Sequence, residues 1–313
     1  MDDRCFDILT DLRKPRFIPV RLSDYESQEL LKIKPDRSVG EYCWTNSSCF
    51  TSFIMNKYKP DYCAYIDSDL YFYDDPNIVI SEMEQYGASV MITGHRFNRV
   101  DRKELIWKVG RYCVEFNTFK NDRNGLFLLE RWKQQCLEYC KSDGDGIHWA
   151  DQKYLDNWCE DYSFCIETTN IGAGVAPWNI AQYKMLDSND FGPTYVRSNG
   201  IVQQLFFYHF QGITYIDNHT AKLNVFTSWG VSKEMVNSLY INYLRHIAST
   251  KELLSEKYGL TALIKKHPGV VELKNPEPFR LVLKRLFSIS GISHWLCRSI
   301  PSRLFGRYNV VHF

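Results

Sequence analysis

The sequence lacks several features that would define a protein class at once. Lys and Arg total 38 and Asp and Glu total 37, so the chain lacks the basic excess of a dedicated nucleic-acid-binding protein. No uninterrupted apolar run reaches the roughly 18 residues that a membrane-spanning helix requires. The first twelve residues are acidic and have no apolar centre, unlike a signal peptide. We therefore expect a cytoplasmic protein that has no nucleic-acid partner.

A cysteine framework is also missing, although the chain contains ten cysteines. No Cys-x-x-Cys pair occurs among them. Cys136 and Cys140 are one helical turn apart, but no histidine stands near them to complete a zinc site. Buried thiols in a reducing compartment are the simpler interpretation.

The composition that is present belongs to a globular protein. Hydrophobic residues make up 44% and charged residues 24%, values that exclude wholesale disorder and a collagen-like chain. The charge is uneven, because residues 271–313 hold seven Lys or Arg against two Glu. Since the whole chain carries +1, the tail carries +5 and residues 1–270 carry −4. We predict a catalytic domain at 1–230 and a basic helical extension at 231–313.

The basic extension includes an amphipathic pattern that begins near Phe279. Helical spacing groups apolar side chains on one side and Arg280, Lys284 and Arg285 on the other. Such a helix binds anionic lipid headgroups. We expect peripheral contact with the inner face of the plasma membrane through residues 278–307. The alternative is that the apolar side packs back on the catalytic domain.

Apolar runs alternate with amphipathic helical patterns along most of the chain. Tyr62–Ile66 is a five-residue apolar run that stops at Asp67, and the run at 88–93 stops before His95. Helical patterns occupy Val39–Tyr58 and 126–140. This alternation predicts an α/β fold with a mostly parallel sheet flanked by helices. In such sheets a ligand binds beyond the carboxyl ends of the strands.

The strongest motif at such a strand end is Asp67-Ser68-Asp69. Two carboxylates this close approach one hard cation, and oxygen ligands suit Mg²⁺ or Mn²⁺. A cation held there would bridge a diphosphate. The alternative is an ordinary polar turn, where Asp is common.

His209 ends a second apolar run and is followed by a turn at Gly212. With the acidic pair, His209 is a candidate third metal ligand, and Gly212 allows the backbone to approach a phosphate. The alternative is a histidine packed in the core.

Three further motifs carry polar groups that suit a sugar phosphate. Asp151 and Gln152 are placed to orient an acceptor hydroxyl and a donor sugar, with helix capping as the alternative for Asp151. Arg96 is a candidate phosphate clamp or a structural ion-pair partner. Trp178 and Asn179 form either a sugar-stacking corner or a packed loop.

Four of these segments occur in an order that resembles a known family. They read IDSDLYF at 66–72, FKND at 119–122, ADQKYLD at 150–156 and YHFQG at 208–212. Over about residues 1–225 the chain resembles nucleotide-sugar glycosyltransferases of the GT-A fold. It looks most similar to bacterial lipopolysaccharide galactosyltransferases and to glycogenin.

The resemblance implies metal-dependent transfer of a sugar from a nucleotide diphosphate to a glycan or lipid-linked acceptor, in surface polysaccharide synthesis. Asp67, Asp69 and His209 would match the metal ligands of the family. Asp151 and Gln152 would match its Asp-Gln pair beside the reacting sugar. The resemblance also suggests retention of the anomeric configuration. If the reaction inverts instead, a carboxylate must take the acceptor proton, and Asp151 is the candidate.

The chain departs from the family in two places. The Asn-x-Gly that opens one strand in many relatives is absent, and Glu115 or Asn117 would replace its donor-sugar contact. The strand, helix and strand that open the relatives are also missing before Met1, which leads us to expect an N-terminally short chain or an unusual minimal form.

Two other functional classes remain open. One is a phosphatase of the haloacid-dehalogenase type, in which the first Asp of a D-x-D motif is a nucleophile. Asp145 and Asp151 superficially resemble the later acidic motif of that family, but Tyr71 stands where Thr or Val is usual. The other is a sugar-binding or scaffolding protein with a degenerate site.

Overall fold

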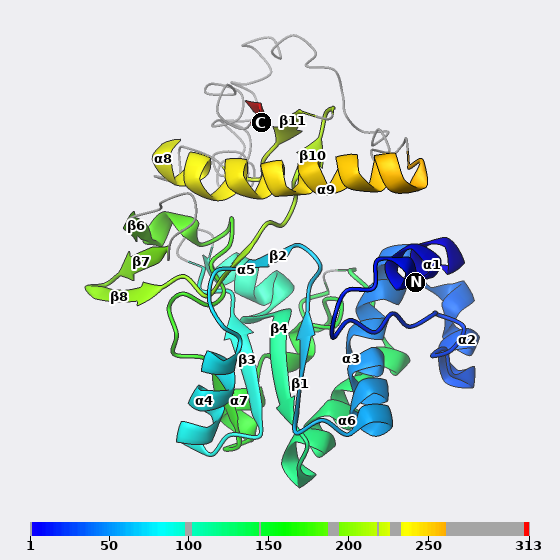
Figure 1. Cartoon of the computed structure of the whole chain (residues 1–313). Helices are drawn as coiled ribbons and strands as arrows, with labels where there is room; N and C mark the ends of the chain where they lie inside the picture. Colours follow the sequence, from blue (N-terminus) through cyan, green and yellow to red (C-terminus); the bar gives the residue numbers. More distant parts are fainter. Residues whose placement is uncertain are drawn as a thin grey trace, which may run out of the picture. The chain divides into compact units, whose positions relative to one another are not determined.

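The computed structural model describes residues 2–97, 102–143, 145–186, 194–217, 219–225, 233–260 and 310–312. Figure 1 shows a mixed α/β protein, and its chain divides into two compact units. The first unit comprises Met1–Ser68, Pro76–His95 and Glu104–Thr169, and the second comprises Asp69–Asp75, Arg96–Lys103 and Asn170–Phe313. This division does not coincide with the boundary at residue 230 that the sequence predicts. The expected membrane-binding segment, 278–307, lies outside the described residues.

The first unit contains most of the helices and one four-stranded sheet. Its strands are β1 (Tyr62–Ile66), β3 (Val90–Gly94), β4 (Tyr112–Lys120) and β5 (Cys165–Glu167). Its α-helices are α1 (Asp3–Asp11), α2 (Gln28–Ile33), α3 (Val39–Tyr58), α4 (Asn77–Tyr86), α6 (Arg123–Glu138), α7 (Trp158–Asp161) and nearly all of α5 (Arg102–Val109). Two short 3₁₀ turns are η1 (Lys34–Asp36) and η2 (Lys153–Leu155).

The sheet of the first unit corrects the prediction of a mostly parallel sheet. The strand order is β1-β4-β3-β5, and only the β3–β5 pairing is parallel. Strands β1, β3 and β5 nevertheless run in one direction, because β4 is inserted antiparallel between β1 and β3. The helical crossovers that signal parallel strands are therefore present, and one reversed strand makes most of the hydrogen-bonded pairs antiparallel.

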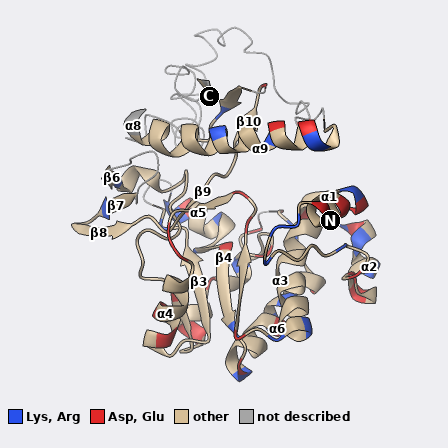
Figure 2. Ribbon diagram, viewed as in Figure 1, with Lys and Arg blue, Asp and Glu red and all other residues tan. Residues whose placement is uncertain are grey.

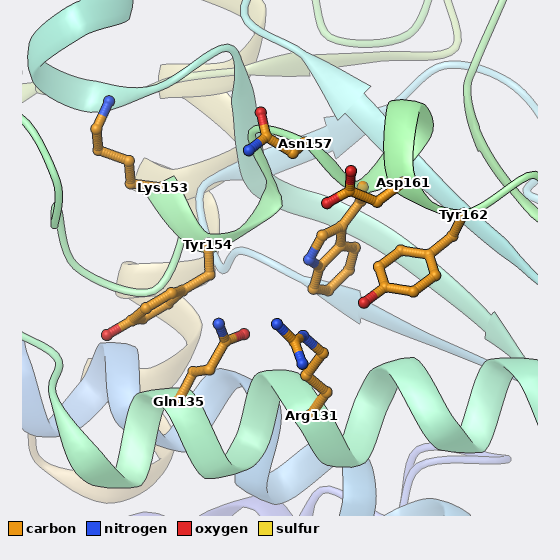
Figure 3. Close-up of a pocket in the computed structure, with 8 residues that line it drawn as sticks. Arg131, Gln135, Lys153, Tyr154, Asn157, Asp161 and Tyr162 are labelled. Carbon is orange, nitrogen blue, oxygen red and sulfur yellow. The ribbon is translucent and has the colours of Figure 1, made fainter.

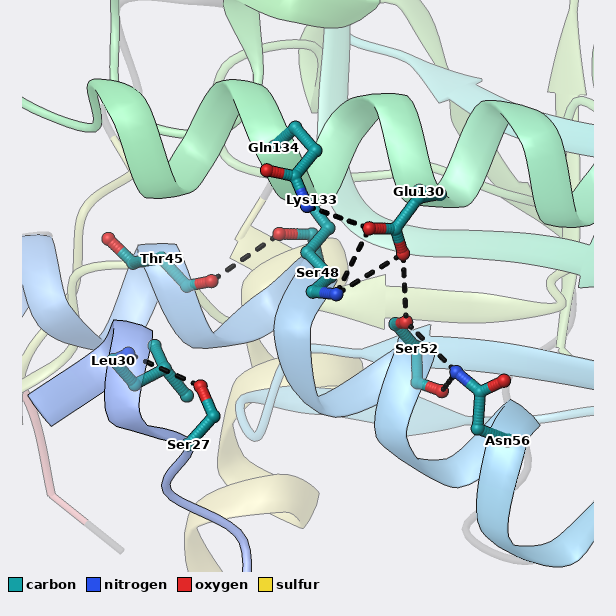
Figure 4. Close-up of polar contacts among 9 residues, drawn as sticks. All are labelled: Ser27, Leu30, Thr45, Ser48, Ser52, Asn56, Glu130, Lys133 and Gln134. Atoms are coloured by element: carbon teal, nitrogen blue, oxygen red, sulfur yellow. Dashed lines mark hydrogen bonds and ion pairs between the residues drawn. The ribbon is translucent and has the colours of Figure 1, made fainter.

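Helices α3 and α6 pack against each other and against this sheet. Met55 of α3 and Trp132 of α6 belong to one buried cluster with Phe119 of β4. The rings of Phe119 and Trp132 stack with their centroids 5.9 Å apart. Ser52 of α3 donates a hydrogen bond to Glu130 of α6 across 3.5 Å, as Figure 4 shows. Apolar packing and a polar margin together fix the position of α3 over the sheet.

Both helices begin where the sequence offers a cap. Ser38 and Glu41 form a capping box before α3, with each side chain bonded to the backbone N–H of the other. Asp122 accepts hydrogen bonds from the backbone N–H groups of Asn124 and Gly125 at the start of α6. These caps explain why α3 matches its predicted bounds and α6 begins only three residues earlier than expected.

The second unit is built mainly from short antiparallel strands. They are β2 (Leu70–Phe72), β6 (Lys184–Leu186), β7 (Tyr195–Ser198), β8 (Ile201–Gln204), β9 (Phe207–His209), β10 (Thr214–Tyr215), β11 (Thr220–Lys222) and β12 (Val310–His312). Its helices are η3 (Ile180–Gln182), α8 (Lys233–Val236), the π-helical η5 (Asn237–Ile241) and α9 (Asn242–Tyr258). The strands form a β2–β9 ribbon, a β6–β7–β8 meander and a β10–β11–β12 sheet.

A second apolar core fills this unit. Tyr208 of β9 is fully buried, and its hydroxyl lies 2.7 Å from that of Tyr240 in η5. Phe210 stacks on Tyr243 of α9 with ring centroids 3.8 Å apart. The helical segment that follows residue 232 is thus packed against β9, the strand that carries His209.

Charged side chains are few in the sheet of the first unit, where Glu115 and Lys120 belong to β4 and Glu167 to β5. In Figure 2 the coloured residues lie mostly on helices and loops, and the strands β1 and β3 carry none. Among the residues described, no helix combines the length and apolarity needed to cross a membrane. The nine cysteines in the described part of the chain are free thiols.

Candidate functional site

Asp67 stands at the end of β1 and is held by the strand itself. Its backbone N–H donates to the carbonyl of Glu115 across 2.9 Å, which extends the β1–β4 pairing by one residue. The hydroxyl of Tyr65 donates to Asp67 Oδ1 across 2.8 Å. The carboxylate is therefore fixed at the strand end.

Asp151 lies in the same unit and is almost completely buried, with 3% of its surface exposed. The hydroxyl of Ser47, on α3, donates to Asp151 Oδ2 across 2.6 Å. The indole N–H of Trp132 donates to the backbone carbonyl of Asp151 across 2.8 Å. The side chain makes no helix cap, because η2 takes Gln152 as its N-cap and has no side-chain cap bond. The capping alternative for Asp151 is therefore wrong, and its carboxyl group is directed to α3.

The surroundings of Asp151 favour its neutral form. Burial raises its pKa to about 7, and the negative charge of Asp67 adds to the rise. The hydrogen bond from Ser47 opposes this shift but does not cancel it. A carboxyl group with such a pKa exchanges its proton near neutral pH, which is the range suited to a general acid or base.

In the second unit, Asp69 and His209 are brought together by the β2–β9 ribbon. Leu70 pairs with His209 in register, and the backbone N–H of Phe210 donates to the carbonyl of Asp69 across 2.9 Å. His209 Nε2 lies 3.1 Å from Asp69 Oδ1. The two residues are far apart in sequence, and only this ribbon makes them neighbours.

The Asp69–His209 pair combines a buried imidazole with a more accessible carboxylate. The side chain of His209 is 6% exposed and that of Asp69 is 41% exposed. Burial works to raise the pKa of Asp69, but the hydrogen bond and charge of His209 outweigh it and hold that pKa below its ordinary value. The ring of Trp178 meets the His209 ring edge-on at 5.2 Å, so Trp178 lies beside the pair.

Asp67 and Asp69 are joined by the single residue Ser68, where the chain passes from the first unit to the second. Two residue steps span at most about 7 Å, so the covalent chain limits the distance between the two Cα atoms to that value. Two carboxylate groups and one imidazole form a donor set that accepts Mn²⁺ or Mg²⁺. The residues present therefore fit the metal that the sequence predicts.

Arg96 and Asn179 are bonded to the loop that precedes η3. Arg96 donates to the carbonyls of Asn170 and Ala173 across 3.1 and 2.9 Å. The Asn179 side chain is fully buried, donates to the Gly174 carbonyl across 2.7 Å and accepts from a backbone N–H of the same loop. These contacts shape the loop that carries Trp178.

The remaining predicted site residues lie in the loop before η2, in β4 and in the turn after β9. Gln152 donates through its amide to the carbonyl of Val109 across 2.6 Å. Glu115 and Asn117 are fully buried in β4. Asn117 stands opposite Tyr65, and both polar atoms of its side chain lack a hydrogen-bond partner in the described part of the chain. Gly212 has a φ of +80°, which a turn of this kind requires.

Ser47 and Tyr65 are site residues that the sequence reasoning missed. Ser47 belongs to a buried polar side of α3, with other members at Thr45, Ser48, Thr51 and Ser52. Many Ser and Thr residues in a helix that is predicted to face a core indicate that its hydroxyl groups bind a buried polar partner. The sequence does not indicate which residue that partner is.

Comparison with known proteins finds two bacterial proteins that are similar to this chain in sequence. No family model matches it. The Uncharacterized protein YfnD of Bacillus subtilis (strain 168) is 28% identical over 259 residues, covering 82% of this chain and 79% of that protein. The Uncharacterized protein YfnF of the same strain is 28% identical over 266 residues, covering 83% of this chain and 85% of that protein. The similarity thus extends over both units, and neither name states an activity.

Proposed function

We propose that the protein is a metal-dependent glycosyltransferase, which moves a sugar from a nucleotide diphosphate sugar to a glycan or lipid-linked acceptor. The observation that carries the proposal is the pairing of Asp69 with His209, whose Nε2 lies 3.1 Å from Asp69 Oδ1. Asp67 stands two residues before Asp69 in the sequence. An acidic pair at the end of a strand, completed by a distant histidine, is the donor set that the family resemblance implies.

The sheet of the first unit supports the GT-A part of the proposal. Strands β1, β3 and β5 share one direction, so Asp67 follows β1 and His95 follows β3 at the same edge of the sheet. Ligands of α/β sheets bind at that edge. The GT-A fold is inferred from the resemblance, and this arrangement agrees with it.

Asp67, Asp69 and His209 would hold Mn²⁺ or Mg²⁺ against the diphosphate. When bound, the cation supplies positive charge that stabilises the leaving nucleoside diphosphate. The Asp69 carboxylate is already ionised at neutral pH, since His209 holds its pKa below the ordinary value. Trp178 lies beside His209, and its ring would provide an apolar surface for the donor sugar.

The family resemblance assigns Asp151 to the reacting sugar and the acceptor hydroxyl, and its pKa suits that role. Its pKa of about 7 lets it take or return a proton at neutral pH, and the hydrogen bond from Ser47 fixes its orientation. In an inverting reaction Asp151 would take the acceptor proton. In a retaining reaction it would orient the hydroxyl or the donor sugar.

The test is release of free nucleoside diphosphate from a panel of nucleotide sugars, with Mn²⁺ and with EDTA. We expect Mn²⁺-dependent release by the wild-type protein and a loss of at least about 100-fold in Asp69→Asn, because one charged metal ligand is removed. Asp61→Asn is the matched control, since Asp61 is exposed at the opposite end of β1.

Three results would contradict the proposal. Activity of Asp69→Asn close to that of the wild type at saturating Mn²⁺ would remove the metal assignment. Release of inorganic phosphate from phosphomonoesters, with no action on nucleotide sugars, would indicate the phosphatase alternative. Absence of any turnover and of any donor binding would leave the scaffold alternative.

A further inference from the structure

The first unit contains a cavity of about 210 Å³ beside α6 and α7 (Figure 3). Arg131 and Gln135 reach it from α6, and Asp161 and Tyr162 face it from the end of α7. None of the predicted donor-site residues lines it. The cavity is therefore a candidate site of its own.

Five polar side chains that line the cavity are available for hydrogen bonding to a ligand. They belong to Arg131, Gln135, Asn157, Asp161 and Tyr162, and their polar atoms make no side-chain hydrogen bond or ion pair with any residue that the structure describes. Gln135 Oε1 is also inaccessible to solvent, so bulk water does not satisfy it. A buried acceptor without a partner is uncommon in a native protein, so Gln135 Oε1 is the group that points to a ligand. Arg131, Asn157 and Asp161 are exposed and hydrated in the free protein, and their side chains are available to a ligand that enters the cavity.

The charges around the cavity exclude a strongly ionic ligand. Arg131 and Asp161 carry opposite charges and balance each other. Lys153 adds no free charge, because its Nζ bonds the carbonyl of Ile106 and the carboxylate of Asp156, each at 3.2 Å. In Figure 3 this amine points away from the other lining side chains. A phosphate would be repelled by Asp161, and a cation by Arg131.

The available groups match the hydroxyls of a sugar. A carboxylate accepts from sugar hydroxyls, a guanidinium donates to them, and amide and phenol groups do both. The rings of Tyr154 and Tyr162, both partly exposed, supply apolar surface for the C–H groups of a pyranose. Tyr154 is held in place by its hydroxyl, which donates to the carbonyl of Tyr139 across 2.6 Å.

We propose that this cavity binds a neutral saccharide unit. The binding needs no divalent cation and no nucleotide, and it does not depend on the proposed transferase activity. The cavity is connected to Asp151 by direct packing, because Trp158 lines it and touches Trp132, which bonds the Asp151 carbonyl. If the chain is a transferase, a glycan bound here would be held on the same unit as Asp151.

The test is a titration followed by saturation-transfer NMR in EDTA, with the methyl glycosides of glucose, galactose and N-acetylglucosamine as probes. We expect millimolar binding of at least one glycoside by the wild-type protein. Arg131→Ala and Asp161→Asn should each weaken it by about tenfold, since each removes a charged hydrogen-bond partner. Lys133→Ala is the matched control on α6, because Lys133 pairs with Glu130 and does not line the cavity. It should leave the affinity unchanged.

The fold of each variant is checked by its melting temperature, which should stay near that of the wild type because Arg131 and Asp161 are exposed. Absence of binding by all three glycosides would overturn the proposal, as would equal binding by wild type, Arg131→Ala and Asp161→Asn. Binding of a zwitterionic amino acid such as alanine, lost in both variants while the glycosides remain inactive, would overturn the saccharide assignment. Failure of the transferase assay would not affect any of these results.

Discussion

Replacing Asp151 by Asn should make the protein more stable at neutral pH and less sensitive to pH. The carboxyl group has an ordinary pKa of 3.8, and burial beside Asp67 raises it to about 7 in the folded protein. Between these values the folded state holds a proton that the unfolded state has lost. The unfolding free energy of the wild type therefore falls as pH rises through this interval.

The magnitude follows from the same two values. One pH unit corresponds to about 1.4 kcal/mol for one proton, so the interval from 3.8 to about 7 amounts to roughly 4 kcal/mol. Below about pH 4 both states are protonated, and Asp151 contributes no pH dependence there. Asn has nearly the same shape, keeps the backbone carbonyl that Trp132 uses, and offers an amide N–H to Ser47.

The measurement is urea unfolding of wild type and Asp151→Asn in EDTA at several values from about pH 4.5 to about pH 8. The difference between the two curves should grow by about 1.4 kcal/mol per pH unit in favour of the variant, and level off above about pH 7. Asp61→Asn, an exposed position, should follow the wild type throughout. Parallel curves for wild type and Asp151→Asn would show that Asp151 titrates normally and would remove its assignment as a base at neutral pH.

Two other predictions concern the Asp69–His209 pair and the packing of α6. His209→Ala should weaken Mn²⁺-dependent binding of a nucleoside diphosphate by about tenfold or more in calorimetry, with metal-free binding unchanged. His219→Ala, in an exposed loop, is its control, and an unaltered Mn²⁺ dependence would return His209 to a packing role. Gly125→Ala should destabilise by about 1–3 kcal/mol, because the added Cβ would lie 2.1 Å from the Lys120 carbonyl oxygen. Gly40→Ala in α3 meets only a distant Trp44 ring at 3.9 Å and should be neutral or stabilising, so equal effects of the two would refute the packing argument.

Local signals in the sequence were sufficient for several elements. The apolar run that became β1 has the predicted bounds, and α3 begins and ends where its capping box and period predict. These elements are specified by residues close together in the chain: Ser38 with Glu41, and five apolar residues bounded by Asp67. Asp67 and Asp69 are two residues apart in the chain, so the sequence alone makes them neighbours.

The direction of β4 was not available from the sequence. The order of apolar and polar side chains along a strand does not state its direction, so the nine residues of β4 fit a parallel or an antiparallel pairing equally well. Its insertion between β1 and β3 is decided by long-range pairing, from Tyr62 with Lys120 to Gly94 with Tyr112. The predicted parallel sheet was wrong for this reason, although the shared direction of β1, β3 and β5 was implicit in the alternation.

The partners of the chemically important groups were decided only by the tertiary structure. Ser47 meets Asp151 because α3 packs over the sheet, and His209 meets Asp69 because β2 pairs with β9. The sequence determined which residue types were present and which followed a strand. Burial decided their protonation, since the pKa of about 7 at Asp151 and the lowered pKa at Asp69 depend on removal from water and on groups that are distant in the chain.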